Sequence, residues 1–333
     1  MTVNVKLFDS LADVAADAGD ALDRANQPCL FQRFEWFAAT AEHCSEGHTP
    51  IIARARDGDA AAWLFLFKTG RRHAEALTSW YSLAYDIVRH GENDALTAEL
   101  AASLADMASL SLGPIADPER IERAFRSNGW KVYRSIATQK WELATPPSFD
   151  DYWAARPGKL RSTVKRKGKK ANLDIKIHRS FDDQAWQDYR EIYAHSWKPE
   201  EGSWDFMKAF AEREGNAGTL RLGVAYQDGQ AVAAQLWTVE NGRATIHKLA
   251  YREDAKSFSP GSILGAAMFR EIIEQDHPKI IDYGTGDQPY KADWMDGRQP
   301  LYTLTLYNPR RPEAWLPLAK QWISGLVRRA PSD

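Results

Sequence analysis

Apolar and polar residues alternate along this chain in a pattern that predicts a mixed α/β fold. Runs with a period of two indicate β-strands, and runs with a period near 3.6 indicate amphipathic helices. In the second half, strands are expected at residues 220–226, 231–239, 243–251 and 279–283, and helices at 181–196, 203–214 and from about 263. Asn241-Gly242, between two of these strands, is typical of a tight hairpin turn.

The first half predicts a similar series of elements. Strands are expected at residues 3–8, 50–56, 60–68, 109–112, 130–134 and 139–143, and helices at 10–24, 31–43, 94–107 and near 118–127. Ser10 suits a helix N-cap, and Asp57-Gly58 indicates a second hairpin. The alternation of Tyr302, Leu304 and Leu306 predicts a final strand.

The two halves share a short sequence similarity as well as an order of elements. Gly58 and Gly229 follow matching Asp residues 171 positions apart, and Gly70 and Gly242 precede matching Arg residues 172 positions apart. A difference of one residue within a strand is what a β-bulge adds. We interpret the chain as a duplicated fold that divides at a proline-rich break after Thr145, with domains at residues 1–146 and 147–333.

Composition and charge narrow the class of protein. The 333 residues are 44% hydrophobic and 26% charged, which is typical of a globular protein, and the formal net charge is −2. Two cysteines exclude a disulfide framework. The first twenty residues lack the features of a signal peptide, and no stretch is apolar enough to span a membrane, so we expect a cytoplasmic protein.

Two segments leave open a peripheral contact with the inner face of the membrane. Seven positive charges fall within residues 159–170, which suits a solvated helix face, a phosphate-bearing acceptor, an anionic membrane surface or RNA. The run has no interleaved aromatic residues, so nucleic acid is the least favoured partner. Near the C-terminus, an apolar helix face from Trp315 to Val327 precedes Arg328-Arg329, and it either packs on the protein or lies in a membrane interface.

A small-residue loop before the helix at residue 263 has the composition of an anion-binding site. Ser259-Pro260-Gly261-Ser262 follows a strand directly, and the unpaired backbone N–H groups of a helix start bind phosphate well. The corresponding segment of the first half, residues 89–94, carries Glu92 and Asp94, which oppose an anion. We expect the first domain to be degenerate, in the sense that it has lost cofactor binding. It would then contribute a scaffold and half of an acceptor groove.

Four stretches together resemble a known family. They are residues 31–36 (FQRFEW), the basic run after Tyr152-Trp153, the loop from Tyr251 to Gly261, and residues 282–294 (DYGTGDQPYKADW). They are similar to the FemAB-like branch of the GNAT acyltransferases, and within it to the cellulose-biosynthesis-type (CelD-like) acetyltransferases. The resemblance implies two tandem GNAT-like domains in an α/β fold of mixed sheet. Only Gly261 remains of the spaced glycines that the family's cofactor loop usually has.

The resemblance implies transfer of an acyl group from acyl-CoA to an amine. It does not fix the acceptor, which we expect to be an envelope or exopolysaccharide amino sugar or a lipid amine such as a sphingoid base. One alternative is a Fem-type transferase that uses aminoacyl-tRNA, although the long coiled-coil insertion of many Fem proteins has no counterpart here. The other is a non-catalytic GNAT-like module that regulates polysaccharide synthesis.

Acyl transfer to an amine needs an acid, a base and a donor site. Tyr290 is the expected acid for the leaving thiolate, on a helix after the strand at residues 279–283, as in similar GNAT proteins. The base candidates are His247, Glu253 and Asp287, of which His247 and Asp287 are preferred. Ordinary structural roles remain open for each: packing for Tyr290 and His247, and a helix N-cap for Asp287.

The remaining candidates are binding residues. For the donor we expect Leu249, Tyr251, Ser259, Gly261, Ser262 and Lys291; for the acceptor groove His195, Trp197 and Trp204; and for an acyl pocket Trp237, Leu249 and Phe258. Asp282 is expected to tie the site loop. No metal is expected, because the ligand-type residues between His43 and His48 have no second cluster at a supporting spacing.

Overall fold

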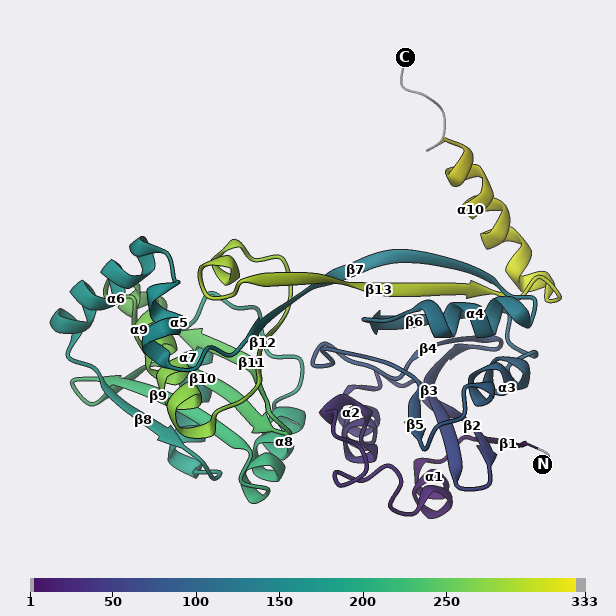
Figure 1. Ribbon diagram of the computed structural model, residues 1–333, viewed down its shortest axis with the longest axis horizontal. Coiled ribbons are helices and arrows are strands. Elements are labelled where there is room, and N and C mark those ends of the chain that lie inside the picture. Colours follow the sequence, from purple (N-terminus) through teal and green to yellow (C-terminus); the bar gives the residue numbers. More distant parts are fainter. Residues whose placement is uncertain (1–2, 328–333) are drawn as a thin grey trace. The chain divides into compact units, whose positions relative to one another are not determined.

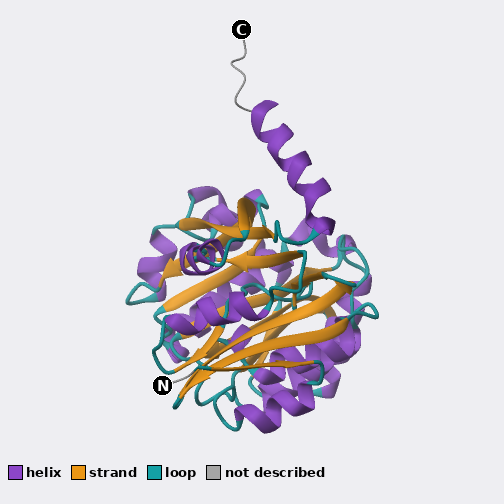
Figure 2. Ribbon diagram, turned by 90° about the vertical axis from the view of Figure 1, so that its right-hand side faces the viewer, coloured by secondary structure: helices purple, strands orange, loops and turns teal. Residues whose placement is uncertain are grey.

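The computed structural model describes residues 3–327, and the side chains as far as Gln321. Contacts divide the chain into two compact units: unit 1 holds the described parts of residues 1–138 and 300–333, and unit 2 holds residues 139–299. Each unit combines parallel and antiparallel strand pairs with flanking helices (Figure 1, Figure 2). The predicted division at residues 146 and 147 follows the duplication rather than these contacts, and it stays a prediction.

Unit 1 has strands β1 (Asn4–Phe8), β2 (Thr49–Asp57), β3 (Ala60–Gly70), β4 (His73–Ala76), β5 (Val88–His90) and β6 (Ser109–Ile115), with helices α1 (Leu11–Ala18), α2 (Phe34–Cys44), α3 (Ala95–Ser103) and α4 (Glu119–Ser127). Strand β7 (Lys131–Ala144) begins in this unit, and β13 (Gly297–Tyr307) ends in it, pairing with β6. Helix α10 (Trp315–Val327) follows.

The local sequence explains most of these elements, and two expectations about helix ends were wrong. The Ser10 side chain accepts a hydrogen bond from the Asp13 amide, as an N-cap should. However, α1 stops at Ala18 instead of residue 24, because Gly19 has a φ of 59° and turns the chain out of the helix. Helix α2 starts at Phe34, after a 3₁₀ turn at Leu30–Gln32.

The hairpin of β2 and β3 is confirmed, with Asp57 opposite Ala60 across a two-residue turn. The core of unit 1 lies on these strands, where Trp63, Leu64 and Phe65 are fully buried. By contrast, the two strands expected at residues 130–134 and 139–143 are one continuous strand, β7. No glycine or proline interrupts residues 131–144, so nothing in the sequence forces a turn there.

Unit 2 contains helices α5 (Phe149–Ala154), α6 (Gly158–Ala171), α7 (Asp183–Ala194), α8 (Trp204–Asn216) and α9 (Pro260–Glu271), strands β8 (Asp174–His178), β9 (Leu220–Gln227), β10 (Gln230–Glu240), β11 (Arg243–Tyr251) and β12 (Ile280–Thr285), and a 3₁₀ helix, η4 (Pro289–Asp293). The sheet order is β7-β12-β11-β10-β9-β8. Every pair is antiparallel except β11 with β12, which is parallel.

Strand β11 separates two environments in unit 2. Successive side chains of a strand point to opposite faces of a sheet. Lys248 therefore faces the segment between α7 and α8, where its Nζ donates to Glu201 Oε1 at 2.8 Å. Leu249 and Tyr251 lie with residues of α9 around a shared cavity. The first turn of α9 is consequently on the face of β11 that carries Leu249 and Tyr251.

The duplicated order of elements is confirmed. Each unit runs strand, two helices, a three-stranded meander, a helix and a strand, as β1-α1-α2-β2-β3-β4-α3-β6 and as β8-α7-α8-β9-β10-β11-α9-β12, and β5 is an addition in unit 1. In both units the strands before and after the crossover helix are parallel and pair over only three residues. In its pairing with β9, strand β10 carries one extra residue between Ala231 and Ala233, and this bulge accommodates the additional residue between Gly229 and Gly242.

The final helix was expected to place apolar residues on one side. Within the described part, Trp315 is 60% exposed and Leu316 is 67% exposed, although the Trp315 indole donates a hydrogen bond to the Pro309 carbonyl at 2.9 Å. The side chains of Trp322, Ile323, Leu326 and Val327, and the residues Arg328-Arg329, lie outside the described part of the chain.

Candidate functional site

The candidate site of unit 2 lies where two parallel strands separate. β11 and β12 pair only from Arg243 with Ile280 to Thr245 with Asp282. Beyond Thr245, β11 continues to Tyr251 beside β10 alone. Asp282 fixes the point of separation: its carboxylate accepts from the Gly284 amide at 2.9 Å and from Arg243 at 3.2 Å, and it is 2% exposed. The expectation that Asp282 ties this loop is consistent with these contacts.

A cavity of about 480 Å³ lies beside the separated strands. It is lined by Leu160, Trp197, Gln235, Leu249, Tyr251, Glu253, Lys256, Gly261, Ser262, Tyr283, Tyr290, Asp293 and Trp294. Its exposed members carry polar groups or aromatic rings, whereas Leu160, Gln235, Tyr283 and Trp294 are buried. The cavity therefore has a polar, aromatic mouth and a largely apolar inner end.

The start of α9 forms one edge of the cavity. The helix begins at Pro260 rather than near residue 263, with proline in its first turn and Ser259 in the left-handed region at φ 56°. The amides expected to hold an anion are those of Gly261, Ser262 and Ile263. The amides of Ser262 and Ile263 donate to the Ser259 carbonyl at 3.1 and 3.2 Å. The Gly261 amide has no hydrogen-bond acceptor within the described residues.

The basic run forms helix α6, which lies against the start of α9. Lys167 Nζ donates to Ser259 Oγ at 2.9 Å, and Leu160 reaches the cavity wall. No ion pair involves any of the helix's seven basic residues within the described chain. Helix α6 thus places excess positive charge next to the cavity.

Tyr290 lies at the mouth of the cavity on η4. It is 40% exposed, and its ring centroid is 6.2 Å from that of Tyr283. Partial burial raises the pKa of Tyr290 to about 12, so the phenol keeps its proton at neutral pH. On the other side of the mouth, Trp197 contacts Tyr251 with ring centroids 4.3 Å apart.

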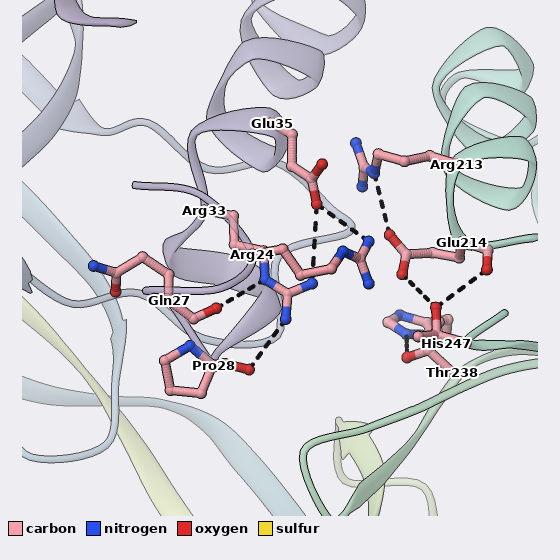
Figure 3. Close-up of polar contacts among 10 residues, drawn as sticks. Arg24, Gln27, Pro28, Arg33, Glu35, Arg213, Glu214, Thr238 and His247 are labelled. Carbon is pink, nitrogen blue, oxygen red and sulfur yellow. Dashed lines mark hydrogen bonds and ion pairs between the residues drawn. The ribbon is translucent and has the colours of Figure 1, made fainter. Parts of the chain in front are cut away.

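The structure does not bring His247 into the cavity. His247 Nε2 lies 2.9 Å from Thr238 Oγ1 (Figure 3). The His247 ring packs edge-on against the Phe210 ring, with centroids 4.8 Å apart. Burial lowers the pKa of His247 to about 3, and Glu214 opposes that change. These contacts match the structural alternative, in which His247 is a packed strand histidine.

Asp287 also lies outside the cavity lining. Its carboxylate is exposed and pairs with Arg298 at 3.2 Å. It is not the N-cap of the following 3₁₀ helix, because that position is Gln288. Glu253, the third base candidate, does line the mouth, with Lys256 Nζ 3.2 Å from its Oε2.

Several expected binding residues support the site from outside the cavity. Lys291 is 5% exposed, and its ammonium donates to the carbonyls of Tyr283 at 3.0 Å and Thr285 at 2.6 Å. His195 is exposed, and its Nδ1 lies 2.9 Å from the Glu191 carbonyl. Trp204 packs among the rings of α7, including Tyr193 at 5.3 Å. Of the expected acyl-pocket residues, only Leu249 lines the cavity; Trp237 and Phe258 do not.

The residues at the inner end of the cavity could not be predicted from the sequence. Leu160 is a single leucine in a basic run, and Trp294 closes the segment that carries the family resemblance, but neither position has a pattern of its own. Gln235 lies on a central strand, where an apolar residue would be ordinary. The crossing of α6, α9 and β10 in three dimensions brings these residues together.

Between residues 3 and 327, no three His, Cys, Asp or Glu side chains gather in a way that can hold a metal ion. Within the same residues no helix has the length and apolar character needed to cross a membrane.

Comparison with known proteins identifies the class of fold. Residues 158–292 match the family model described as an acetyltransferase (GNAT) domain. Among solved structures, the chain is similar to FemX, with a TM-score of 0.63, 10% identity, and coverage of 96% of this chain and 99% of that one. No curated protein sequence matches the chain.

Two further solved structures are similar over nearly their whole length. One is the C-terminal domain of a putative lysylphosphatidylglycerol synthetase from Agrobacterium fabrum, with a TM-score of 0.56, 13% identity, and coverage of 94% of this chain and 97% of that one. The other is a tandem GNAT protein from the clavulanic acid biosynthesis pathway, with a TM-score of 0.50, 13% identity, and coverage of 91% and 98%. At 10–13% sequence identity, these similarities show a shared fold alone.

The expected fold class is therefore confirmed: an α/β chain of mixed sheet with the tandem GNAT architecture. In its second half, residues 158–292 match the GNAT-type acetyltransferase model, and the candidate site falls inside or directly beside these residues.

Proposed function

We propose that the protein is an N-acyltransferase that moves an acyl group from acyl-CoA to an amine. The observation that carries this proposal is the cavity at the separation of β11 and β12. It lies in the GNAT-type domain and is bordered by a helix start, an apolar wall and a protonated phenol. These are the surroundings that a phosphate-bearing thioester and its leaving thiolate need.

The donor would lie along β11 with its phosphates near the start of α9. Gly261 and Ser262 border the cavity there. In the same loop, Lys167 Nζ donates a hydrogen bond to Ser259 Oγ at 2.9 Å. Leu249 and Tyr251 supply the wall for the pantetheine arm. The Lys291 ammonium is instead bound to the carbonyls of Tyr283 and Thr285 on β12, so we place Lys291 outside the donor contacts.

The chemistry requires one bond to form and one to break. The amine nitrogen attacks the thioester carbonyl, the C–N bond forms, and the C–S bond breaks, so that an amide and a thiol result. Tyr290 is proposed to give its proton to the leaving thiolate, and Glu253 at the mouth to accept the ammonium proton. Backbone amides on the edge of β11 beyond Thr245 are available to stabilise the oxyanion, because β12 no longer pairs there.

The mouth of the cavity suits an amine with a planar or apolar body. Trp197 and Tyr251 present adjoining aromatic rings, and the Glu253 carboxylate lies beside them to bind an ammonium group. An amino sugar of the cell envelope or an exopolysaccharide, or a lipid amine, has this combination of groups. We favour the amino sugar, in keeping with the resemblance to cellulose-biosynthesis-type acetyltransferases.

Helix α6 favours a second candidate for the donor. Its seven basic residues lack intramolecular ion pairs in the described chain, and the helix borders the cavity. A polyanion such as aminoacyl-tRNA can neutralise such a charge. One similar structure is titled as a lysylphosphatidylglycerol synthetase domain, which keeps aminoacyl transfer as the alternative. A regulatory module without catalysis is the third candidate.

The same charge supports a proposed contact with the anionic inner face of a membrane. Each basic residue near such a surface contributes about 1 kcal/mol to the free energy of binding. Cosedimentation with vesicles of anionic and of zwitterionic phospholipid tests this contact. Binding to the anionic vesicles alone, weakened by salt, supports it. If equal amounts of protein sediment with both kinds of vesicle, or if none sediments with either, the contact is contradicted.

Thermal unfolding with coenzyme A, acetyl-CoA and an aminoacyl-tRNA mimic tests the function. A ligand at about 100 times its dissociation constant stabilises the folded protein by about 2.7 kcal/mol, which is easily measured. Stabilisation by a coenzyme A species, with thiol release in the presence of glucosamine, supports the proposal. Stabilisation by the tRNA mimic alone selects the second candidate, and binding of a nucleotide without thioester consumption selects the regulatory module.

A further inference from the structure

The inner end of the cavity is formed by buried side chains from distant parts of unit 2. Leu160 comes from α6, Gln235 from β10, Tyr283 from β12 and Trp294 from the residues after η4, and they are 8%, 4%, 6% and 5% exposed. Trp294 is the largest of the four. Its position therefore has the greatest influence on how far the cavity extends.

Trp294 is held from several sides. Its ring stacks on Phe269 of α9 with centroids 5.3 Å apart and lies 6.1 Å from the ring of Trp153. Its carbonyl accepts a hydrogen bond from the Tyr152 hydroxyl at 3.0 Å. A ring fixed by such contacts cannot swing aside without breaking them, so the inner end has a firm limit.

Gly265 of α9 provides the space for this ring. A Cβ atom at residue 265 would lie 3.0 Å from Trp294 Cη2 and 3.3 Å from Gln235 Nε2. A glycine in a helix interior costs about 1 kcal/mol relative to alanine, so its presence here fits a packing requirement. Gly265 and Trp294 together set the depth of the cavity beside the start of α9.

We propose that Trp294 closes the inner end of the cavity and restricts the donor to thioesters of short acyl groups. The inference rests on the proposed function, because the acyl group enters the cavity only if acyl-CoA is the donor. The packing supports it: Trp294 is 5% exposed and its ring stacks on Phe269, so a longer alkyl chain would have to displace that ring.

Two substitutions change the inner end in opposite directions. Trp294→Leu removes the distal ring and deepens the cavity, so we expect the preference to move from acetyl-CoA towards octanoyl-CoA. Gly265→Ala presses on Trp294 and narrows the cavity, so we expect weaker use of butanoyl-CoA with acetyl-CoA less affected. Gly158→Ala is the matched control, because a Cβ at this helical glycine meets no atom within 4 Å.

The experiment compares thiol release from acetyl-, butanoyl-, octanoyl- and palmitoyl-CoA with one saturating amine. Wild-type kcat/KM should fall at least tenfold between acetyl and octanoyl donors, and Trp294→Leu should reduce or reverse this ratio. Calorimetric titration with each acyl-CoA gives a second readout, the change of Kd with chain length, which does not depend on turnover. Thermal unfolding of each variant shows whether it is folded.

The outcomes separate this inference from the proposed function. If coenzyme A binds and wild type uses all chain lengths equally, the short-chain inference is wrong and the acyltransferase remains. If wild type prefers acetyl-CoA and folded Trp294→Leu keeps the same ratio, Trp294 does not set the limit. If no coenzyme A species binds, the proposed function itself fails.

Discussion

At the scale of single residues, some of the side chains expected in the site border the cavity, and others lie outside it. Tyr290, Leu249, Tyr251, Gly261 and Ser262 border the cavity as their positions in the sequence suggested. Lys291 and His247 are instead engaged in internal hydrogen bonds. A lysine or histidine near a site motif looks the same in sequence in either case, and only its partners distinguish the two.

Replacing Tyr290 by Phe tests the proposed acid. The change removes the hydroxyl and keeps the ring at the mouth of the cavity. Because a positioned general acid contributes about 100-fold or more, turnover should fall by about that factor while the Kd for coenzyme A stays the same. Steady-state kinetics and calorimetry give the two quantities. Unchanged turnover in a folded Tyr290→Phe protein would remove Tyr290 from the mechanism.

The pH dependence of stability tests the buried state of His247. An unfolded histidine titrates near 6.5, and burial lowers the folded pKa to about 3. Between these values the unfolded chain binds a proton that the folded chain does not. The free energy of unfolding therefore falls as pH falls from about 6.5 towards 3, and this contribution is fully present above 6.5.

His247→Gln removes that titration and keeps a polar group for Thr238. The loss of unfolding free energy between pH 7 and pH 5, measured with urea, should be smaller in the variant than in wild type by about 1 to 2 kcal/mol. His195→Gln, at an exposed position, is the control and should behave as wild type. An identical pH dependence in all three proteins would contradict a buried, neutral His247.

At the scale of elements, the start of α9 shows how a helix terminus and a strand are fitted together. A Cβ at Gly261 would lie 2.9 Å from Tyr251 Cδ1, so only glycine allows α9 to begin this close to β11. The sequence identified this loop through its small residues and the strand before it. It did not reveal that the first amides bond to Ser259 or that Lys167 reaches the same residue.

Gly261→Ala tests this fit. The methyl group must displace Tyr251 or the first turn of α9, so we expect the Kd for coenzyme A to rise about tenfold, equivalent to about 1.4 kcal/mol. Gly158→Ala should leave this Kd unchanged, because its Cβ meets no atom within 4 Å. Calorimetric titration provides the comparison. Equal affinities in the two variants would show that the close approach is not needed for donor binding.

At the scale of the whole molecule, two compact units share strands across their sequence boundaries. Strand β13 starts within unit 2 and ends in unit 1, where Leu304 and Leu306 are fully buried and pair with β6. The sequence alone places residues 300–307 in the second predicted domain, because they directly follow the rest of it. The contacts assign them to unit 1.

Leu304→Ala tests this assignment. Loss of a buried leucine costs about 2 to 5 kcal/mol, and the cost should fall on unit 1 although Leu304 follows unit 2 in the chain. Hydrogen exchange followed by mass spectrometry should show faster exchange in β6 and little change in α9. Leu264→Ala, at a fully buried position of α9, should give the reverse pattern. Faster exchange confined to unit 2 in Leu304→Ala would contradict the assignment.

The sequence by itself determined the elements and their repetition. Alternation, caps and turn residues depend on neighbours within a few positions, so Ser10, the Asp57-Gly58 hairpin and the order of elements in both halves followed from local rules. The additional residue between Gly229 and Gly242 was visible as a spacing, and the bulge of β10 against β9 accommodates it.

Only the tertiary structure decided which side chains share a site. Leu160, Gln235, Tyr283 and Trp294 are far apart in the sequence and meet because α6, β10, β12 and the residues after η4 surround the start of α9. Burial and partners depend on such long-range packing, which periodicity does not encode. The same reason explains why His247 is enclosed and why Glu253 lies at the mouth.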